Sequence, residues 1–358
     1  MRCRHSNPHC TQRGAALVAA MLVFALSAAL IVAMQSDFTR LYQRSSNIFI
    51  DEQSRSYLRG AEGLATLALL ADYDADAKAE VAQDTLEDIW ARDEVPYPLE
   101  DGGWLAGEVE DLQGRFNLNS LTEVTQQGAG QPRFTPAQAQ FIRLLQAVAE
   151  PELSEQQAIT ITQAVGDWVD GDQQARLDGA EDDYYTGLTP AYRVANRPMA
   201  SVSELRAVKG MTAELFQALQ PFVTVWPQVS GRLNIHTAPA MVLRSVAPQD
   251  ELVPLSAEEG AALASYRCEN GFTDLADFFD HPVLADNKEK LQVQMAGLLT
   301  QQSEYFLLRA RVEVAGRNQR LYSVLQRQNR QVSVLSRIAD GRVSLPQPKR
   351  EPACEKSL

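Results

Sequence analysis

The sequence predicts an α+β fold in which a long N-terminal helix and an antiparallel sheet carry a large inserted all-α domain. Three observations predict this fold. An apolar run, 15–34, follows a short basic leader. Strand-like stretches lie far apart, at 104–112 and 304–327, and the chain between them, 132–299, is mostly helical in its periodicity. An insertion between strands of one sheet explains this order.

The apolar run from Ala15 to Met34 is long enough to cross a membrane. It holds no charged side chain, and at about 1.5 Å per residue a helix of this length spans roughly 30 Å of hydrocarbon. The leader, residues 1–14, carries Arg2, Arg4 and Arg13, which favour a cytoplasmic N-terminus. We expect a single-pass membrane protein, in contact with lipid, whose larger part faces the other side.

Helical periodicity continues after the membrane run. Apolar residues spaced by three or four positions predict that the same helix continues to about residue 70 as a spine packed on a soluble domain. A second helix is expected over 75–92, before Pro96 breaks the chain.

The strands are expected in two groups. Trp104–Leu112 belongs to a first α+β piece, 71–131, and Glu304–Val314 to a second piece, 300–340. Arg320–Arg327 is the expected partner of the second strand, across a turn at Gly316-Arg317-Asn318.

The inserted all-α domain is expected to cover 132–299, and a mobile tail to follow at 341–358. Each expected helix start combines a polar cap or a proline with an apolar period. These starts are Thr135-Pro136, Ser154, Ser201, Thr237-Ala238-Pro239 and Ser256.

Composition indicates a folded, acidic protein. Hydrophobic residues make up 45% of the chain and charged residues 22%, which suits sizeable cores. The net charge of −13 becomes −16 once the three leader arginines are removed. Such a surface repels phosphates, so no nucleic acid partner is expected. Outside the leader the cysteines are Cys268 and Cys354. The sequence allows either a disulfide between them or two free thiols.

An acidic segment is the strongest chemical constellation in the chain. Its seven carboxylates are Asp167, Asp170, Asp172, Asp178, Glu181, Asp182 and Asp183. Oxygen ligands at alternating positions, with glycines for turns, suit calcium, although the spacing differs from that of an EF-hand. The aromatic residues Trp168, Tyr184 and Tyr185 indicate that the segment packs against another part of the protein. A solvated acidic loop is the alternative.

No catalytic motif supports an enzyme. Outside the leader the histidines are His236 and His281, and no HExxH, GxSxG, CxxC or phosphate-loop pattern occurs. His236 lies at an expected helix start and is interpreted as a capping or packing residue. His281, before Pro282, is interpreted as a turn residue.

The junction Arg13-Gly14-Ala15 resembles a type IV pilin-like signal. In such signals a prepilin peptidase cleaves after the glycine and methylates the new N-terminus, which here would be Ala15. An uncleaved signal anchor is the alternative, and it gives the same topology.

Ala19 departs from the usual pattern, because most pilin-like proteins carry a glutamate at the fifth position after cleavage. Its absence is known in the largest minor pseudopilin of type II secretion, the general secretion pathway protein K family. Residues 115–119, 197–210 and 233–238 are similar to segments of that family. The resemblance implies a pilin-like fold at the tip of a periplasmic fibre, where it starts or caps assembly. It also implies inner-membrane anchoring, I-type and J-type partners, and calcium in the helical domain.

Two rival readings remain. One is the tip minor pilin of a type IV pilus. The other is a membrane-anchored helix-hairpin-helix DNA receptor, which Leu233–Ala238 and Ser256–Phe279 resemble. Acidic residues outnumber Arg267 around that second stretch, so the helical fold is interpreted as a scaffold.

Overall fold

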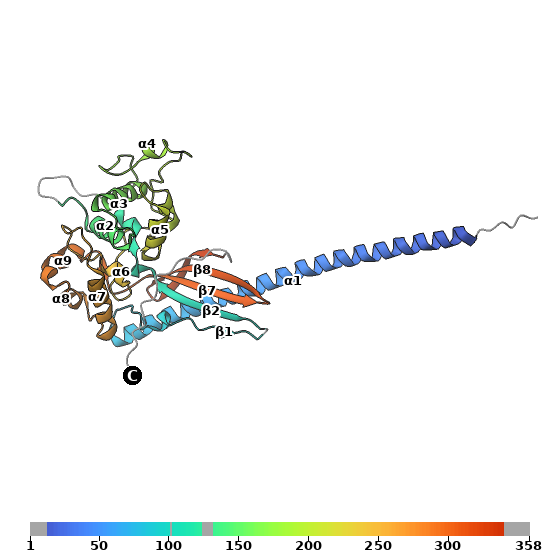
Figure 1. The fold of residues 1–358 in the computed structure, drawn as a ribbon. Helices are drawn as coiled ribbons and strands as arrows, with labels where there is room; N and C mark the ends of the chain where they lie inside the picture. Colours follow the sequence, from blue (N-terminus) through green and yellow to red (C-terminus); the bar gives the residue numbers. More distant parts are fainter. Residues whose placement is uncertain (1–12, 101, 124–131, 340–358) are drawn as a thin grey trace, which may run out of the picture.

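The longest element is a single helix that projects from the rest of the chain (Figure 1). The computed structural model describes residues 13–100, 102–123 and 132–339. Helix α1, Arg13–Ala79, is continuous over 67 residues, so the predicted spine continues past residue 70. Its N-terminal part holds an apolar stretch long enough to cross a membrane, and none of the most hydrophobic window is buried.

The C-terminal half of α1 packs on an antiparallel sheet. Leu58, Ala61, Ala65 and Leu69 are buried on one face of the helix and join a core with the sheet, a spacing of three to four residues that suits one helical face. Phe306 of the sheet contributes to the same core and meets the Trp90 ring edge to face, with centroids 5.1 Å apart.

The sheet joins the two predicted strand groups. Its strands are β1 Tyr97–Pro98, β2 Trp104–Asp111, β7 Tyr305–Val314, β8 Arg317–Gln328 and β9 Gln331–Ile338, in the order β1-β2-β7-β8-β9. β2 pairs with β7, with Trp104 opposite Glu313. The fold class predicted from the sequence is confirmed by this arrangement.

Two details of the sheet differ from the prediction. The β7–β8 turn lies at Ala315 and Gly316, whose φ angles are 51° and 74°, so the predicted turn at Gly316-Arg317-Asn318 is wrong by one position. Two consecutive left-handed residues match the twist of a tight hairpin and leave Val314 opposite Arg317. β9 was not predicted as a separate strand.

The helix predicted over 75–92 is wrong. α1 ends at Ala79, and Glu80 adopts a left-handed φ of 54°, which helices do not continue through. Asp84 is then fully buried and accepts the Ser303 backbone N–H at 2.7 Å. Because these contacts demand an irregular backbone, the described residues between Ala79 and residue 92 form only the 3₁₀ turn η1, Ile89–Ala91.

Residues 132–299 form the helical region. Its α-helices are α2 Pro136–Val148, α3 Glu155–Val169, α4 Asp182–Tyr185, α5 Ala213–Leu219, α6 Ala240–Leu243, α7 Ala257–Glu269, α8 Leu275–Asp280 and α9 Lys288–Met295. The 3₁₀ helices beside and within it are η2 Leu112–Gly114, η3 Leu118–Thr122, η4 Val202–Ala207, η5 Gln220–Phe222 and η6 Ala285–Asn287.

The predicted helix starts are largely confirmed. Thr135, Ser154 and Ser256 each cap an α-helix through a reciprocal capping box. Ser201 has the same box but begins the 3₁₀ helix η4, and α6 starts after Pro239. Cys268, in α7, is disulfide-bonded, whereas Cys354 and the expected tail lie outside the described residues.

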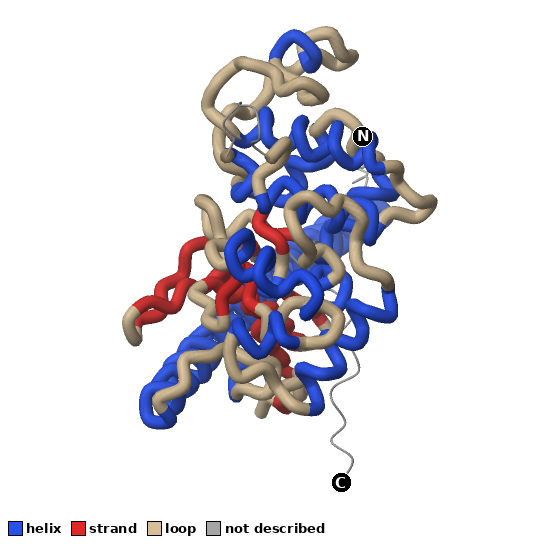
Figure 2. The backbone as a smooth tube through the Cα atoms, turned by 90° about the vertical axis from the view of Figure 1, so that its left-hand side faces the viewer, coloured by secondary structure: helices blue, strands red, loops and turns tan. Residues whose placement is uncertain are grey.

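Two short parallel ladders tie the helical region together and to the sheet. β3, Phe116–Asn117, pairs with β4, Val223–Thr224, and β5, Leu233–Asn234, pairs with β6, Leu299–Thr300. One core of buried residues runs through this whole region. Viewed from the left-hand side of Figure 1, the helical region faces the viewer and the strands lie behind it (Figure 2).

Candidate metal centre and domain junction

Asp167 organises the loop that follows α3. Its carboxylate is fully buried and accepts backbone N–H groups from Arg176, at 3.2 and 3.3 Å, and from Ala180, at 2.7 Å. The Arg176 guanidinium lies 3.3 Å from the same carboxylate. Burial raises the pKa of Asp167 to about 6, against the opposing effect of these bonds. Asp167 therefore ties residues 176 and 180 of the loop to the last turn of α3, which favours a structural role for it.

Three of the seven acidic residues converge. Asp170, Asp172 and Glu181 each place a carboxylate oxygen within 4.8 Å of the others. Glu181 is only 6% exposed, and neither of its oxygens has a hydrogen-bond partner among the described residues. Oδ1 of Asp170 is also buried and has no hydrogen-bond partner among the described residues. Such orphaned buried acceptors are costly unless a ligand satisfies them.

The electrostatics of this trio favour a cation. Burial raises the pKa of Glu181 to about 7, and the nearby charges of Asp167, Asp170 and Asp172 raise it further. Burial also raises the pKa of Asp170. Hard oxygen donors around buried negative charge fit a divalent ion such as calcium. The trio thus fits the metal that the sequence suggested.

The other acidic residues of the segment point elsewhere. Asp178 lies 3.8 Å from Arg133. Asp182 accepts the Val194 N–H at 3.1 Å, and Asp183 is exposed in the first turn of α4. We place these three, with Asp167, outside the group of converging oxygens.

The loop packs on an aromatic wall, as the tyrosines and tryptophan of the segment indicated. Trp168 meets Tyr185 edge to face at 5.4 Å, and Tyr185 lies 5.3 Å from Tyr192. The segment 197–210 also holds the loop: Lys209 donates to the loop's backbone carbonyls at residues 178 and 179, at 3.3 and 2.9 Å. Lys209 and Arg176 were missed by sequence reasoning, although Arg176 is the only basic residue within 167–183.

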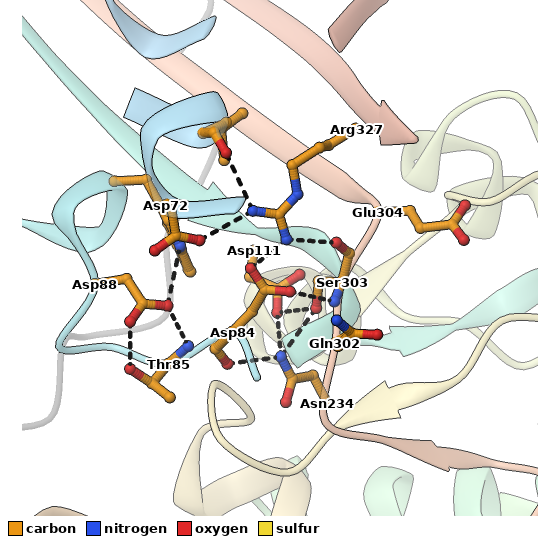
Figure 3. Close-up of polar contacts among 12 residues, drawn as sticks. Asp72, Asp84, Thr85, Asp88, Asp111, Asn234, Gln302, Ser303, Glu304 and Arg327 are labelled. Carbon is orange, nitrogen blue, oxygen red and sulfur yellow. Dashed lines mark hydrogen bonds and ion pairs between the residues drawn. The ribbon is translucent and has the colours of Figure 1, made fainter. Parts of the chain in front are cut away.

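A second acidic group lies where the sheet meets the helical region (Figure 3). Asp72, Asp84 and Asp88 place carboxylate oxygens within 4.8 Å of one another. Arg327 of β8 binds Asp72 at 3.0 Å and also pairs with Asp84. Thr85 donates to Asp88 through both its backbone N–H and its hydroxyl, at 2.7 and 2.9 Å. These carboxylates already have partners, so the group is a structural junction.

Asp111 extends this junction into the helical region. It is buried at the end of β2 and accepts bonds from Asn234 at 3.1 Å, Thr237 at 2.5 Å and Ser303 at 2.6 Å. Asn234 also donates to the Asp84 carbonyl at 3.0 Å. Burial raises the pKa of Asp111 to about 6 and that of Asp72 to about 7. We call Asp72, Asp84, Asp88, Asp111 and Arg327, with these partners, the polar junction.

The two histidines lie where the sequence interpretation placed them, His236 in a packed interior and His281 at the end of a helix. His236 is buried, and burial lowers its pKa. Its ring lies 3.5 Å from the Gln301 side chain. His281 is the C-cap of α8, and its Nδ1 accepts the Val283 N–H at 3.3 Å.

Comparison with known proteins identifies the family. A protein of Klebsiella pneumoniae named type II secretion system protein K is 32% identical, over 91% of this chain and 96% of that relative. The chain belongs to the type II secretion system protein K family. The family model "Type II secretion system (T2SS), protein K" matches residues 114–228, and the protein K of Pseudomonas aeruginosa is 33% identical over 88% of this chain and 89% of its own.

A solved structure agrees with this assignment. It is the crystal structure of the GspK-GspI-GspJ complex from enterotoxigenic Escherichia coli, with a TM-score of 0.68 and 27% identity, covering 83% of this chain and 99% of that chain. The protein K resemblance and the α+β pilin-like fold are therefore confirmed. Membership of the protein K family makes the chain a minor pseudopilin of type II secretion, and neither the type IV pilus nor the DNA receptor reading is favoured.

Proposed function

We propose that the chain stands at the tip of the type II secretion pseudopilus, bound to I-type and J-type minor pseudopilins, and starts or caps the fibre. One observation carries the proposal: the helical region lies beside the end of the spine helix farthest from the membrane segment and extends past it (Figure 1). A further subunit stacked beyond that end would clash with it. Ala19 supports the same position, because it offers no carboxylate to a neighbour's N-terminal amine.

The partner assignment rests on similarity. The similar solved chain comes from a complex of GspK, GspI and GspJ, and this chain shares its fold. We propose inner-membrane anchoring through α1, with the remaining residues in the periplasm. We also propose that the function is assembly, without catalysis of a reaction.

Photo-crosslinking in cells tests the tip position. A photoreactive amino acid replaces Phe49, on α1, or Val253, between α6 and α7; both side chains are 69% exposed. We expect crosslinks to other pseudopilins from position 49 and none from position 253. Equal crosslinking of pseudopilins from both positions would place a subunit beyond the helical region and contradict the proposal.

We further propose that Asp170, Asp172 and Glu181 hold calcium. The unsatisfied oxygens of Glu181 and Asp170 support this assignment. The ion would link the C-terminus of α3, where Asp170 is the cap, to the N-terminus of α4, where Glu181 is the cap. Titration calorimetry of the detergent-solubilised full chain with calcium chloride is the direct test, and an absence of binding heat across temperatures would reject the site.

A further inference from the structure

Arg176 lies between the acidic trio and the body of the helical region. Its Nη2 donates to Oδ2 of Asp170 at 3.1 Å and to the Thr122 carbonyl at 3.3 Å, while Nη1 donates to the Leu121 carbonyl at 3.1 Å. The side chain is only 10% exposed. The guanidinium therefore sits in a fixed, largely dry position beside the proposed ligands.

Two glycines leave the room that this position needs. A Cβ at Gly166 would lie 1.7 Å from Nη1 of Arg176, and a Cβ at Gly179 would lie 1.9 Å from Oδ2 of Asp167. Neither distance is compatible with a side chain, because both are far inside van der Waals contact. Glycine is therefore required at both positions for Arg176 and Asp167 to lie where they do.

The two carboxylate oxygens of Asp170 have different surroundings. Its Oδ2 meets Arg176, whereas its Oδ1 is buried without a hydrogen-bond partner in the described residues. Oδ1 is thus the oxygen left for a cation shared with Asp172 and Glu181. A metal and the guanidinium would then occupy opposite oxygens of one carboxylate.

We propose that Arg176 is an internal counter-cation of the calcium loop: it keeps the loop folded without metal and weakens calcium binding by sharing Asp170. The inference rests on the proposed calcium site and adds its regulation. Like charges on the two sides of one half-buried carboxylate repel, because little water screens them. The loop's backbone is held separately, since Asp167 binds the backbone N–H groups of Arg176 and Ala180. Removing the charge should therefore lower the stability of the metal-free loop while the backbone bonds to Asp167 stay in place.

The test compares Arg176→Gln with Arg193→Gln in the full chain in detergent. Arg193 is the matched control, since it lies 3.9 Å from Asp182 but its side chain is 80% exposed. We expect Arg176→Gln to bind calcium about tenfold more tightly by calorimetry, which corresponds to about 1.4 kcal/mol. Its melting temperature in chelator should fall below that of the wild type. Arg193→Gln should match the wild type in both measurements.

Arg176→Lys separates charge from shape. Lysine keeps the positive charge but lacks the fork that reaches both carbonyls, so its calcium affinity should stay within about threefold of wild type. This comparison still decides the question if Arg176→Gln does not fold. Tightening in Arg176→Lys equal to that expected for Arg176→Gln would overturn the role of the charge.

The outcomes distinguish the two proposals. Calcium binding by the wild type with unchanged or weaker binding by Arg176→Gln overturns the role of Arg176 alone. A wild-type chain that does not bind calcium rejects the calcium site itself, and this inference with it.

Discussion

At the scale of single residues, Gly14 should control processing. A pilin-like signal at this junction would place cleavage between Gly14 and Ala15, and both residues lie in the first turn of α1. Gly14→Leu should leave a precursor that keeps the leader, because a bulky side chain would not fit the peptidase site. Mass spectrometry of the purified chain measures the N-terminus. Ala19→Glu is the control and should be processed and inserted normally; a wild-type N-terminus other than Ala15 would contradict the prediction.

Arg143 should be among the residues most important for stability. It is fully buried in α2 and donates to the backbone carbonyls of Ser245 at 2.7 Å, Ala247 at 2.9 Å, Pro248 at 3.0 Å and Glu251 at 2.5 Å. Burial lowers its pKa to about 10, so it remains charged near neutral pH.

Arg143→Met should lower the free energy of unfolding by about 2–4 kcal/mol, because it leaves several buried carbonyls without donors. Chemical denaturation measures the change. Arg206→Met, which removes an exposed arginine near the Phe216 ring, should cost less than about 1 kcal/mol. Equal losses in the two variants would show that the buried bonds contribute little.

At the scale of elements, local signals predicted helices better than they predicted the acidic loop. The helix starts at Thr135 and Ser154 rest on capping boxes between residues three apart, so the sequence alone predicts these starts. The helix expected over 75–92 failed because Asp84 is bound by Arg327, a residue distant in the chain. Likewise, spacing suggested seven ligands, whereas folding directs Asp178 toward Arg133 and buries Asp167 inside the loop.

Calcium should stabilise the loop if the trio binds it. A ligand that binds only the folded chain adds about 2.7 kcal/mol at a hundredfold excess over its Kd, which corresponds to a rise of several degrees in melting temperature. Magnesium should raise it less, since it gives up water reluctantly. Glu181→Gln combined with Asp170→Asn should abolish the rise, whereas Asp183→Asn, an exposed neighbour, should keep it. Identical melting curves with chelator, calcium and magnesium would mark the loop as a solvated surface.

At the scale of the whole molecule, the polar junction joins α1, the sheet and the helical region, which the sequence predicted only as separate parts. Its members come from α1, β2, β8 and the helical region, and Asp72 and Arg327 are 255 positions apart. The fold class was predictable because each part has its own periodicity. The junction was not predictable, since no local pattern shows which buried carboxylate meets which donor.

The polar junction should make stability depend on pH. Burial raises the pKa of Asp72 to about 7 and of Asp111 to about 6, above the value of about 3.9 for an unfolded chain. The folded chain therefore holds more protons than the unfolded chain between about pH 4 and 7, so stability should fall as pH rises through this window. The slope is at most about 1.4 kcal/mol per pH unit for each proton.

Thermal melts in chelator from pH 5 to 8 measure this dependence. Asp72→Asn should reduce the slope, because the amide does not titrate, whereas the other carboxylates with raised pKa values, such as Asp111, still do. Asp74→Asn is the control, since Asp74 pairs with Arg330 at the surface and its pKa is lowered; this variant should keep the wild-type slope. A melting temperature that rises between pH 5 and 8 would refute the expected sign.

The continuity of α1 has a mechanical consequence. No proline interrupts the helix between Arg13 and Ala79, and at about 1.5 Å per residue it forms a rod roughly 100 Å long. Asp72, near its far end, is locked to Arg327 and through it to β8. An axial force applied at the N-terminal end of α1 would therefore be transmitted along one continuous helix to the ion pairs of the polar junction. From these ion pairs the force would pass to the helical region.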